Sequence, residues 1–261
     1  MNTNADITFN QGVFTVSIDF ELYWGVRDNW TIEQYKNNLE GVSHAIPEIL
    51  KVFNENGIHA TWATVGFLFF ENYNDLKENI PDIIPNYTNE KISPYKYMNE
   101  ADNLESKYHF APKLIDLINN TPGQEIGCHS FSHYYCIEEG QTDNEFKNDM
   151  LSSIEIAKQK NICLKSFVFP RNQYRQDYLS TLSKLGIKCY RGNESNWIYN
   201  NSKSSIRRKT QRILRFLDSY FNISGNNTYP LKKCFQKRPY NFPSSRFLRP
   251  YSPKLSVFEN L

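Results

Sequence analysis

The chain of 261 residues lacks the features of several protein classes. Its five cysteines include no C-x-x-C pair, which argues against both a disulfide framework and a zinc ribbon. No apolar run approaches the roughly 18 residues that a membrane-spanning helix needs. Residues 1–6 lack the basic and apolar regions of a signal peptide. We therefore expect a soluble, cytoplasmic protein of a reducing compartment, without a membrane span.

Hydrophobic residues are scarce, at 39% of the chain, whereas aromatic residues are abundant, at 15%. With 18 Phe and 17 Tyr, the core is expected to contain rings as much as aliphatic side chains. A chain of this length can bury a sizeable core in one large α/β domain or two small ones.

The net charge of +2 hides an uneven distribution. Residues 1–200 carry 17 basic and 26 acidic side chains, whereas residues 201–261 carry 13 and 2. Such a basic segment can bind nucleic acid, anionic lipid or a polyanionic glycan, although a solvated face packed against the acidic body of the same fold is commoner. Because no helix-turn-helix, zinc-finger or RNP pattern is present, we expect no nucleic-acid partner.

Residues 205–221 have an amphipathic pattern within this basic segment. The pattern predicts a helix that packs Ile213, Leu214 and Leu217 against the rest of the fold. The cations expected on its exposed side are Arg207, Arg208, Arg212 and Arg215. A helix lying on a membrane surface is the alternative, because basic amphipathic helices are also typical there.

Strand-like and helix-like segments alternate along the chain. The predicted strands lie at 14–20, 59–67, 125–129, 166–170 and 187–191. The predicted helices lie at 31–56, 111–120, 142–161 and 176–185. This alternation predicts an α/β fold with parallel strands joined by right-handed crossovers.

The chain is expected to divide after residue 222. Residues 1–222 would form the α/β domain, in which the polar segment 80–110 is read as an insertion rather than a core element. Residues 223–261 would form a basic, irregular C-terminal segment.

The strongest chemical motif contains two histidines, His129 and His133, which directly follow a predicted strand. One helical turn between them would place both rings on the same side, as a shared metal ion requires. Asp19 and Glu21 end the first predicted strand at positions i and i+2, so both carboxylates are aimed into the same space. The alternative is a pair of solvated carboxylates at a strand end, although burying an unpaired carboxylate beside the apolar strand is costly.

Three segments together resemble the polysaccharide deacetylase superfamily (NodB homology, carbohydrate esterase family 4). They are VSIDFE at 16–21, EIGCHSFSH at 125–133 and FVFPRNQ at 167–173, in the family's order and approximate spacing. The resemblance covers roughly residues 12–200 and implies a distorted (β/α)₇-like barrel with its site at the carboxyl ends of the strands. The stretch after residue 222 offers little chain to close such a barrel, which indicates truncation at the C-terminus.

The resemblance also implies roles for individual residues. His129 and His133 would bind the metal. The family's T-F-D-D motif has Phe20 in place of its second Asp here, so by similarity to members with D-x-D, Asp19 would be the general base and Glu21 the third ligand. Zinc is the expected metal for this ligand set, with nickel, cobalt or iron as alternatives.

The third motif departs from the family's R-x-P pattern. Arg171 follows Pro170, and Val168 stands where the family has its arginine. Arg171 would then hold the base carboxylate from a shifted position, while an ion pair with a surface acid is the alternative. The expected substrate-binding residues are Trp24, Asn172 and Arg191.

The implied function is metal-dependent removal of an N- or O-acetyl group from a sugar or a surface-polysaccharide precursor. The family usually carries a late histidine that protonates the leaving amine, but no histidine follows His133. We therefore expect metal binding with poor turnover. A metal-bound water or a tyrosine near the third motif, such as Tyr174 or Tyr190, could act in part as a substitute proton donor. A non-catalytic relative that binds metal or glycan, or an amidase on the same scaffold, are the alternatives.

Overall fold

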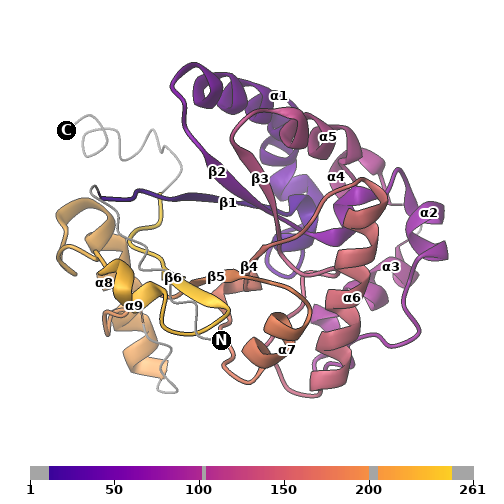
Figure 1. The fold of residues 1–261 in the computed structure, drawn as a ribbon. Helices are drawn as coiled ribbons and strands as arrows, with labels where there is room; N and C mark the ends of the chain where they lie inside the picture. The colour runs from indigo at the N-terminus through magenta and orange to yellow at the C-terminus, as the bar shows by residue number, and fades with distance from the viewer. Residues whose placement is uncertain (1–11, 102–103, 200–204, 249–261) are drawn as a thin grey trace, which may run out of the picture.

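The structure is a computed structural model that describes residues 12–101, 104–199 and 205–248 (Figure 1). Six strands form one sheet in the order β1-β2-β3-β4-β5-β6, and every neighbouring pair is parallel. The strands are β1 (Val16–Phe20), β2 (Ala60–Thr64), β3 (Gln124–Cys128), β4 (Ser166–Val168), β5 (Cys189–Gly192) and β6 (Tyr240–Pro243). The predicted α/β fold with parallel strands is confirmed.

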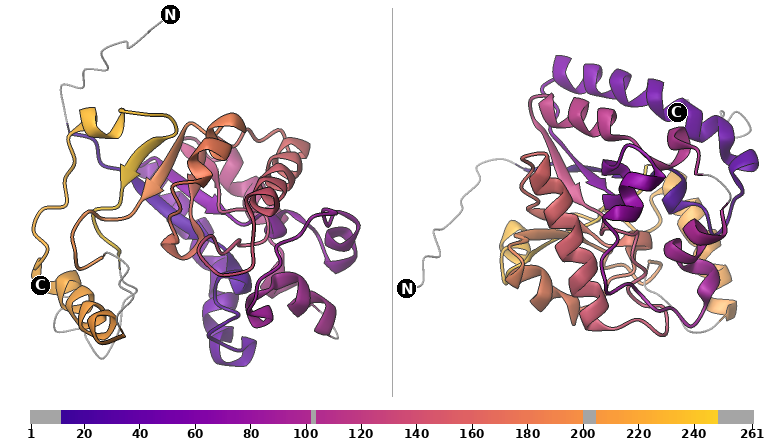
Figure 2. Two further views of the ribbon diagram at one scale, coloured as in Figure 1. Left: turned by 90° about the horizontal axis from the view of Figure 1, so that it is seen from below. Right: turned by 90° about the vertical axis from the view of Figure 1, so that its right-hand side faces the viewer.

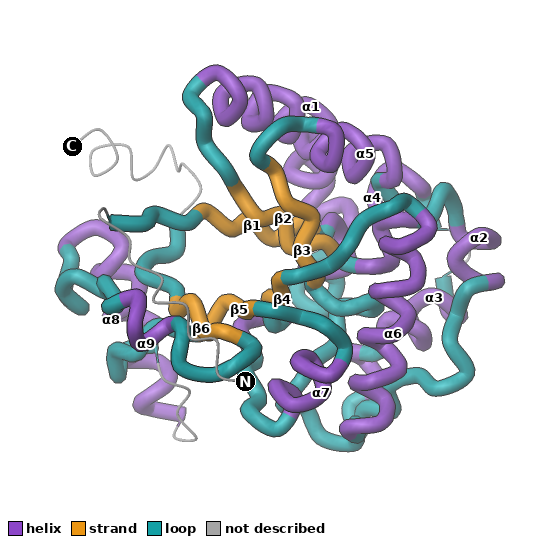
Figure 3. Tube along the Cα trace, in the orientation of Figure 1, coloured by secondary structure: helices purple, strands orange, loops and turns teal. Residues whose placement is uncertain are grey.

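The sheet curls into an incomplete barrel, with β1 and β6 facing each other across its open side (Figure 3). Within the described residues, β1 pairs only with β2 and β6 only with β5. The family resemblance led us to expect seven strands, and the described part of the chain supplies six. The strand after β5 lies beyond residue 222, in the segment expected to be irregular.

Helices link the strands and pack outside the curled sheet (Figure 2). They are α1 (Ile32–Glu55), α2 (Tyr73–Glu78), α3 (Pro94–Glu100), α4 (Ser106–His109), α5 (Pro112–Asn120), α6 (Asp143–Gln159), α7 (Tyr178–Lys184), α8 (Ser205–Phe221) and α9 (Leu231–Cys234). Four short 3₁₀ turns are η1 (Leu22–Gly25), η2 (Gly66–Phe69), η3 (Glu90–Ile92) and η4 (Pro170–Asn172). The predicted start of α6 is confirmed, since Thr142 and Glu145 form a capping box.

The core is built largely from aromatic rings, as the composition predicts. The largest fully buried side chains include Trp24, Trp62, Tyr134, Tyr135, Tyr178, Phe67, Phe70, Phe131, Phe146, Phe167 and Phe169. Phe67 lies at the centre of one group and meets Trp24, Tyr95 and Phe131 edge-on, with ring centroids 4.8, 5.5 and 5.0 Å away. Edge-to-face contacts of this kind stabilise a core beyond the area they bury.

The segment 80–110 contributes to this core. It contains α3 and α4, and it buries Tyr95 and Met98 against the main hydrophobic cluster. Its polar composition concealed these few inward side chains. The status of 80–110 as an insertion and the boundary after residue 222 remain predictions.

Two features bear on the expected class of the protein. All five cysteines are free thiols. No helix in the described ranges is long and apolar enough to cross a bilayer.

Helix α8 forms where the pattern predicts it, but its packing differs from the prediction. Ile213 is 61% exposed, whereas Gln211 and Asp218 on the opposite side are buried. Arg212 is exposed, as predicted, whereas Arg215 was also expected to be exposed and is half-buried. The inward packing predicted for Ile213 is wrong because hydrogen bonds of the two polar side chains orient the helix. The side chains of Arg207 and Arg208 lie outside the described part of the chain.

Truncating the ring at the centre of the core should destabilise the fold strongly. Phe67→Ala removes three edge-to-face contacts and leaves a cavity, so we expect a loss of about 3–5 kcal/mol in the free energy of unfolding. Phe14→Ala is the control, because Phe14 is 90% exposed. Urea denaturation measures both variants, and equal midpoints would contradict this account of the core.

Candidate metal centre

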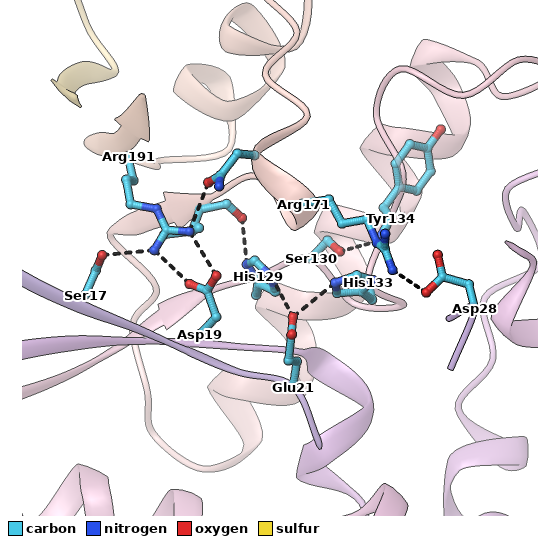
Figure 4. Close-up of polar contacts among 12 residues, drawn as sticks. Ser17, Asp19, Glu21, Asp28, His129, Ser130, His133, Tyr134, Arg171 and Arg191 are labelled. Carbon is cyan, nitrogen blue, oxygen red and sulfur yellow. Dashed lines mark hydrogen bonds and ion pairs between the residues drawn. The ribbon is translucent and has the colours of Figure 1, made fainter. Parts of the chain in front are cut away.

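Three side chains meet where β1 and β3 end (Figure 4). Potential ligand atoms of Glu21, His129 and His133 all lie within 4.8 Å of one another. Oε2 of Glu21 is 3.2 Å from Nε2 of His129 and 3.1 Å from Nε2 of His133. Both imidazoles are buried, while the glutamate is partly exposed. We call this set the triad.

The parallel sheet explains why residues so far apart in the chain converge. Glu21 directly follows β1, and His129 directly follows β3, with β2 pairing between the two strands. Carboxyl ends of neighbouring parallel strands meet at one edge of the sheet, so the side chains that follow them lie close together. The sequence prediction that these residues share one space agrees with this geometry.

The orientation of His129 is set by a backbone carbonyl. Its Nδ1–H donates a hydrogen bond of 3.0 Å to the carbonyl oxygen of Val168, the last residue of β4. Since a carbonyl only accepts, Nε2 is left unprotonated in the neutral ring and faces the triad. Such an outer hydrogen bond commonly orients histidines that bind metals. Sequence reasoning missed this contact because a backbone acceptor leaves no signature in residue type.

Gly25 leaves the space that the Glu21 carboxylate occupies. A Cβ atom at position 25 would lie 1.9 Å from Cδ and 2.0 Å from Oε1 of Glu21. The chain turns back here through η1, whose first turn includes a hydrogen bond of 3.1 Å from Trp24 N–H to the Glu21 carbonyl. The glutamate reaches the histidines only because residue 25 has no side chain.

Electrostatics favours an ionised Glu21 and a neutral His133, the forms that bind a cation. Burial by itself would raise the pKa of Glu21, but the two adjacent imidazoles hold that pKa well below its usual range. Burial lowers the pKa of His133, while Glu21 acts in the opposite direction. In the described structure neither Nε2 atom makes a hydrogen bond of good geometry. Two neutral imidazoles and an ionised carboxylate are a common ligand set for catalytic zinc, so these residues fit the metal implied by the motif.

The side chain of Asp149 in α6 supports loop 129–133 through hydrogen bonds. This buried carboxylate accepts hydrogen bonds from the backbone N–H groups of Phe131, at 2.7 Å, and Ser132, at 3.1 Å, and from the Ser132 hydroxyl. Burial raises the pKa of Asp149 to about 6, against the effect of these donors. The residue was missed by sequence reasoning, although an aspartate beside apolar Met150 in the middle of a predicted helix was a usable signal.

The neighbouring loop after β2 supports loop 129–133 from the side. Gly66 N–H donates to the Ser130 carbonyl at 2.9 Å, and Phe67 N–H donates to the Phe131 carbonyl at 3.0 Å. A Cβ at position 66 would lie 2.8 Å from the Phe131 Cα, so only glycine permits this approach.

Asp19 forms an ion pair with Arg191 rather than with Arg171. Nη1 and Nη2 of Arg191 lie 2.8 and 2.9 Å from the two Asp19 oxygens, a bidentate arrangement (Figure 4). The same guanidinium donates to Ser17 Oγ at 3.0 Å and to Asn172 Oδ1 at 3.1 Å. The curl of the sheet brings β5 across from β1, which explains how an arginine predicted to bind substrate reaches the carboxylate instead.

Arg171 lies on the other side of the triad and pairs with Asp28 (Figure 4). It belongs to η4 and has a positive φ of 54°. The predicted contact between Arg171 and the base carboxylate is therefore absent from the described structure. The alternative interpretation, an ion pair with another acid, agrees with the geometry.

Trp24 does not line an accessible surface. Its ring is fully buried, and its indole N–H donates to the His109 carbonyl at 2.7 Å. The prediction that Trp24 binds a sugar is wrong because the residue is committed to the core. Asn172 remains exposed, although its side-chain oxygen accepts from Arg191.

Backbone strain is concentrated around the triad. Seven non-glycine residues of the described structure have positive φ. Five of them follow β1, β3 or β4: Leu22, Ser130, His133, Arg171 and Asn172. Left-handed backbone at non-glycine residues is uncommon and clusters at functional sites, so this distribution marks the same edge of the sheet as the triad.

Replacing Asp149 should loosen loop 129–133. Asp149→Asn substitutes an NH₂ group for one acceptor that faces N–H donors, so we expect a loss of about 2–3 kcal/mol in the free energy of unfolding. Lys147→Ala, at an exposed neighbouring position of α6, is the control and should change stability little. Chemical denaturation measures both, and unchanged stability in the Asp149 variant would remove this carboxylate from the support of the loop.

Comparison with solved structures reveals distant similarity. Similar structures include a CE4 family pseudoenzyme from Bacillus anthracis (14% identity, 67% of this chain and 42% of that chain, TM-score 0.37). Others are the BpsB deacetylase domain from Bordetella bronchiseptica (10%, 67% and 62%, 0.40) and the Streptococcus pyogenes deacetylase PplD in complex with acetate (14%, 68% and 54%, 0.39). The chain thus spans 42% to 62% of the length of these three relatives.

Comparison with protein families is more decisive. No curated protein sequence matches the chain. The family model for polysaccharide deacetylase, in contrast, matches residues 40–190, which is more than half of the chain and includes both histidines of the triad. The chain therefore belongs to the polysaccharide deacetylase family.

Proposed function

We propose that this chain is a metal-dependent deacetylase that removes an N- or O-acetyl group from a sugar or a surface-polysaccharide precursor. The observation that carries the proposal is the convergence of Glu21, His129 and His133 beside the ion-paired Asp19. Membership of the polysaccharide deacetylase family supports an acetylated carbohydrate as the substrate class. Zinc is the metal that we propose for this ligand set.

Glu21, His129 and His133 would hold the metal, each through one atom. A divalent metal bound there would polarise the acetyl carbonyl and lower the pKa of a water molecule. Asp19, two residues before Glu21 on the same strand, is the proposed general base that takes the proton of the attacking water. Its carboxylate accepts from Arg191 through both oxygens, and each oxygen keeps a further acceptor position for that water.

Arg191 is the proposed positioning residue for the base, in place of Arg171. Its four hydrogen bonds to Asp19, Ser17 and Asn172 fix the guanidinium and, through it, the carboxylate. Arg171 has no such contact, and we propose no catalytic role for it. Arg171 and Asn172 are both exposed beside the triad. We propose that they contact the substrate.

Adding a single methyl group at position 25 should prevent metal uptake. In Gly25→Ala the new Cβ takes the place of the Glu21 carboxylate, so we expect metal affinity to fall by at least about 10- to 100-fold. Gly41→Ala is the control, because a Cβ at that helical position meets open space. Isothermal titration of the metal-free proteins with zinc measures the effect, and His129→Ala serves as the reference for loss of a ligand.

The wild-type protein should bind about one zinc ion per chain, as one set of three ligands implies. Unchanged affinity in Gly25→Ala would show that Glu21 is not a ligand. Stoichiometric zinc in His129→Ala would contradict the assignment of the whole centre.

The two arginines offer a matched pair for the catalytic assignment. Arg191→Ala frees the base carboxylate, so acetate release should fall by about 10²- to 10⁴-fold, close to the loss in Asp19→Asn. Arg171→Ala removes an equal charge but leaves that ion pair intact, so its effect should be much smaller. Zinc stoichiometry measured on the same samples shows whether metal binding persists. Equal losses in the two arginine variants would refute the positioning role of Arg191.

The chemistry of the leaving group should decide the rate. Within these 261 residues no histidine follows His133, so we propose that this chain protonates a leaving amine poorly. An acetyl ester of an acidic phenol needs no proton on its leaving group, whereas an N-acetyl sugar does. We therefore expect the ratio of ester hydrolysis to N-acetyl sugar hydrolysis to be about 10²- to 10⁴-fold higher for this chain than for relatives that carry the late histidine.

Initial rates of zinc-loaded protein on both substrates provide the measurement. An N-acetyl sugar hydrolysed at the rate typical of such relatives would mean that another residue protonates the amine. Stoichiometric zinc without hydrolysis of either substrate would favour the second candidate function, a non-catalytic metal- and glycan-binding protein.

A further inference from the structure

Helix α8 turns two polar side chains inward and exposes apolar side chains together with cations. Gln211 Nε2 donates to the Trp197 carbonyl at 2.8 Å. Asp218 accepts from the Tyr199 hydroxyl at 2.6 Å and from the Ser224 hydroxyl at 2.7 Å. Gln211 and Asp218 are seven residues apart, which is about two helical turns, so both lie on the same side of α8. Their hydrogen bonds turn this side of the helix towards residues 197–199 and 224.

The opposite side of α8 exposes two cations and two apolar residues in one stripe. Lys209, Arg212, Ile213 and Phe216 follow one another at intervals of three, one and three residues, which places them on one face of a helix. Lys209, Arg212 and Ile213 are exposed, and Phe216 is partly exposed.

Further exposed apolar residues lie near the C-terminal end of the helix. Ile223 is exposed just after α8. Arg246 binds back to the end of α8, since its guanidinium donates to the Asp218 carbonyl at 2.7 Å. The two residues that follow it, Phe247 and Leu248, are therefore held near that end, and Leu248 is 93% exposed. We call Lys209, Arg212, Ile213 and Phe216 the α8 surface.

The charge of this region is strongly positive. Residues 201–261 contain 13 Lys and Arg against two Asp and Glu. Asp218, the acidic residue among 205–248, is fully buried and forms an ion pair with Arg246. No exposed carboxylate therefore offsets the cations in this described part of the segment.

The α8 surface lies apart from the helices that cover the sheet near the triad. In both Figure 1 and the left view of Figure 2, α8 and α9 occupy the opposite side of the molecule from α2 and α6. Contact of this surface with a broad partner therefore leaves the α2 and α6 side free.

We propose that the α8 surface binds the interface of an anionic lipid membrane. A helix whose exposed face combines cations with Ile and Phe gains from both headgroup attraction and shallow apolar insertion. Nucleic acid would use the cations but not the exposed Ile213 and Phe216. The acidic surface of a second copy of this chain could also attract the cations. It lacks the apolar region below the headgroups of a membrane, into which Ile213 and Phe216 could insert.

Co-sedimentation with vesicles tests the proposal. Vesicles of phosphatidylcholine with about one third phosphatidylglycerol should bind the protein at least tenfold more tightly than phosphatidylcholine alone, and salt should weaken the binding. Ile213→Asp and Arg212→Glu should each reduce binding about tenfold or more. Leu117→Asp is the matched control, because Leu117 is an exposed leucine on α5 and lies outside the α8 surface.

Circular dichroism confirms folding of every variant before the assay. Equal binding to neutral and anionic vesicles, no binding to either, or full binding by Ile213→Asp would overturn the proposal. A dimer in sedimentation equilibrium that Ile213→Asp abolishes, without vesicle binding, would assign the surface to a second copy instead. The zinc titration is independent of all these outcomes, so failure here leaves the proposed function untouched.

Discussion

The candidate site depends on the hydrogen bonds that the buried carboxylate of Asp149 accepts from loop 129–133. Loop 129–133 has two left-handed residues, Ser130 and His133, and a chain in that conformation needs support from outside. Asp149 supplies it through the amides of residues 131 and 132, and helix α6 fixes the position of the carboxylate. Both imidazoles then point into the sheet edge, where a single glutamate meets them.

Much of this arrangement can be predicted from the sequence because it follows from local rules. Residues that follow parallel strands of one sheet lie at the same edge of that sheet, so Glu21, His129 and His133 were expected to lie near one another. The capping residue Thr142 and the alternation of strands and helices follow from patterns within a few residues.

Other contacts were beyond such rules because they depend on how the sheet curls and on backbone groups. Arg191 reaches Asp19 although β2, β3 and β4 separate their strands within the sheet, and residue type says nothing of that distance. The Val168 carbonyl that orients His129 is likewise invisible in the sequence. In α8, periodicity predicts the helix, but two buried polar side chains outweigh its apolar stripe in deciding which side faces inward.

The left-handed residues around the triad set a limit on how stable this fold can become. Each non-glycine residue held in that region costs of the order of 1 kcal/mol, which a glycine would recover. Such a replacement at Ser130 would also free the loop to leave the geometry that aims the two imidazoles. Sequence changes selected only for thermal stability would therefore tend to erode the binding centre, so in this part of the molecule durability and function oppose each other.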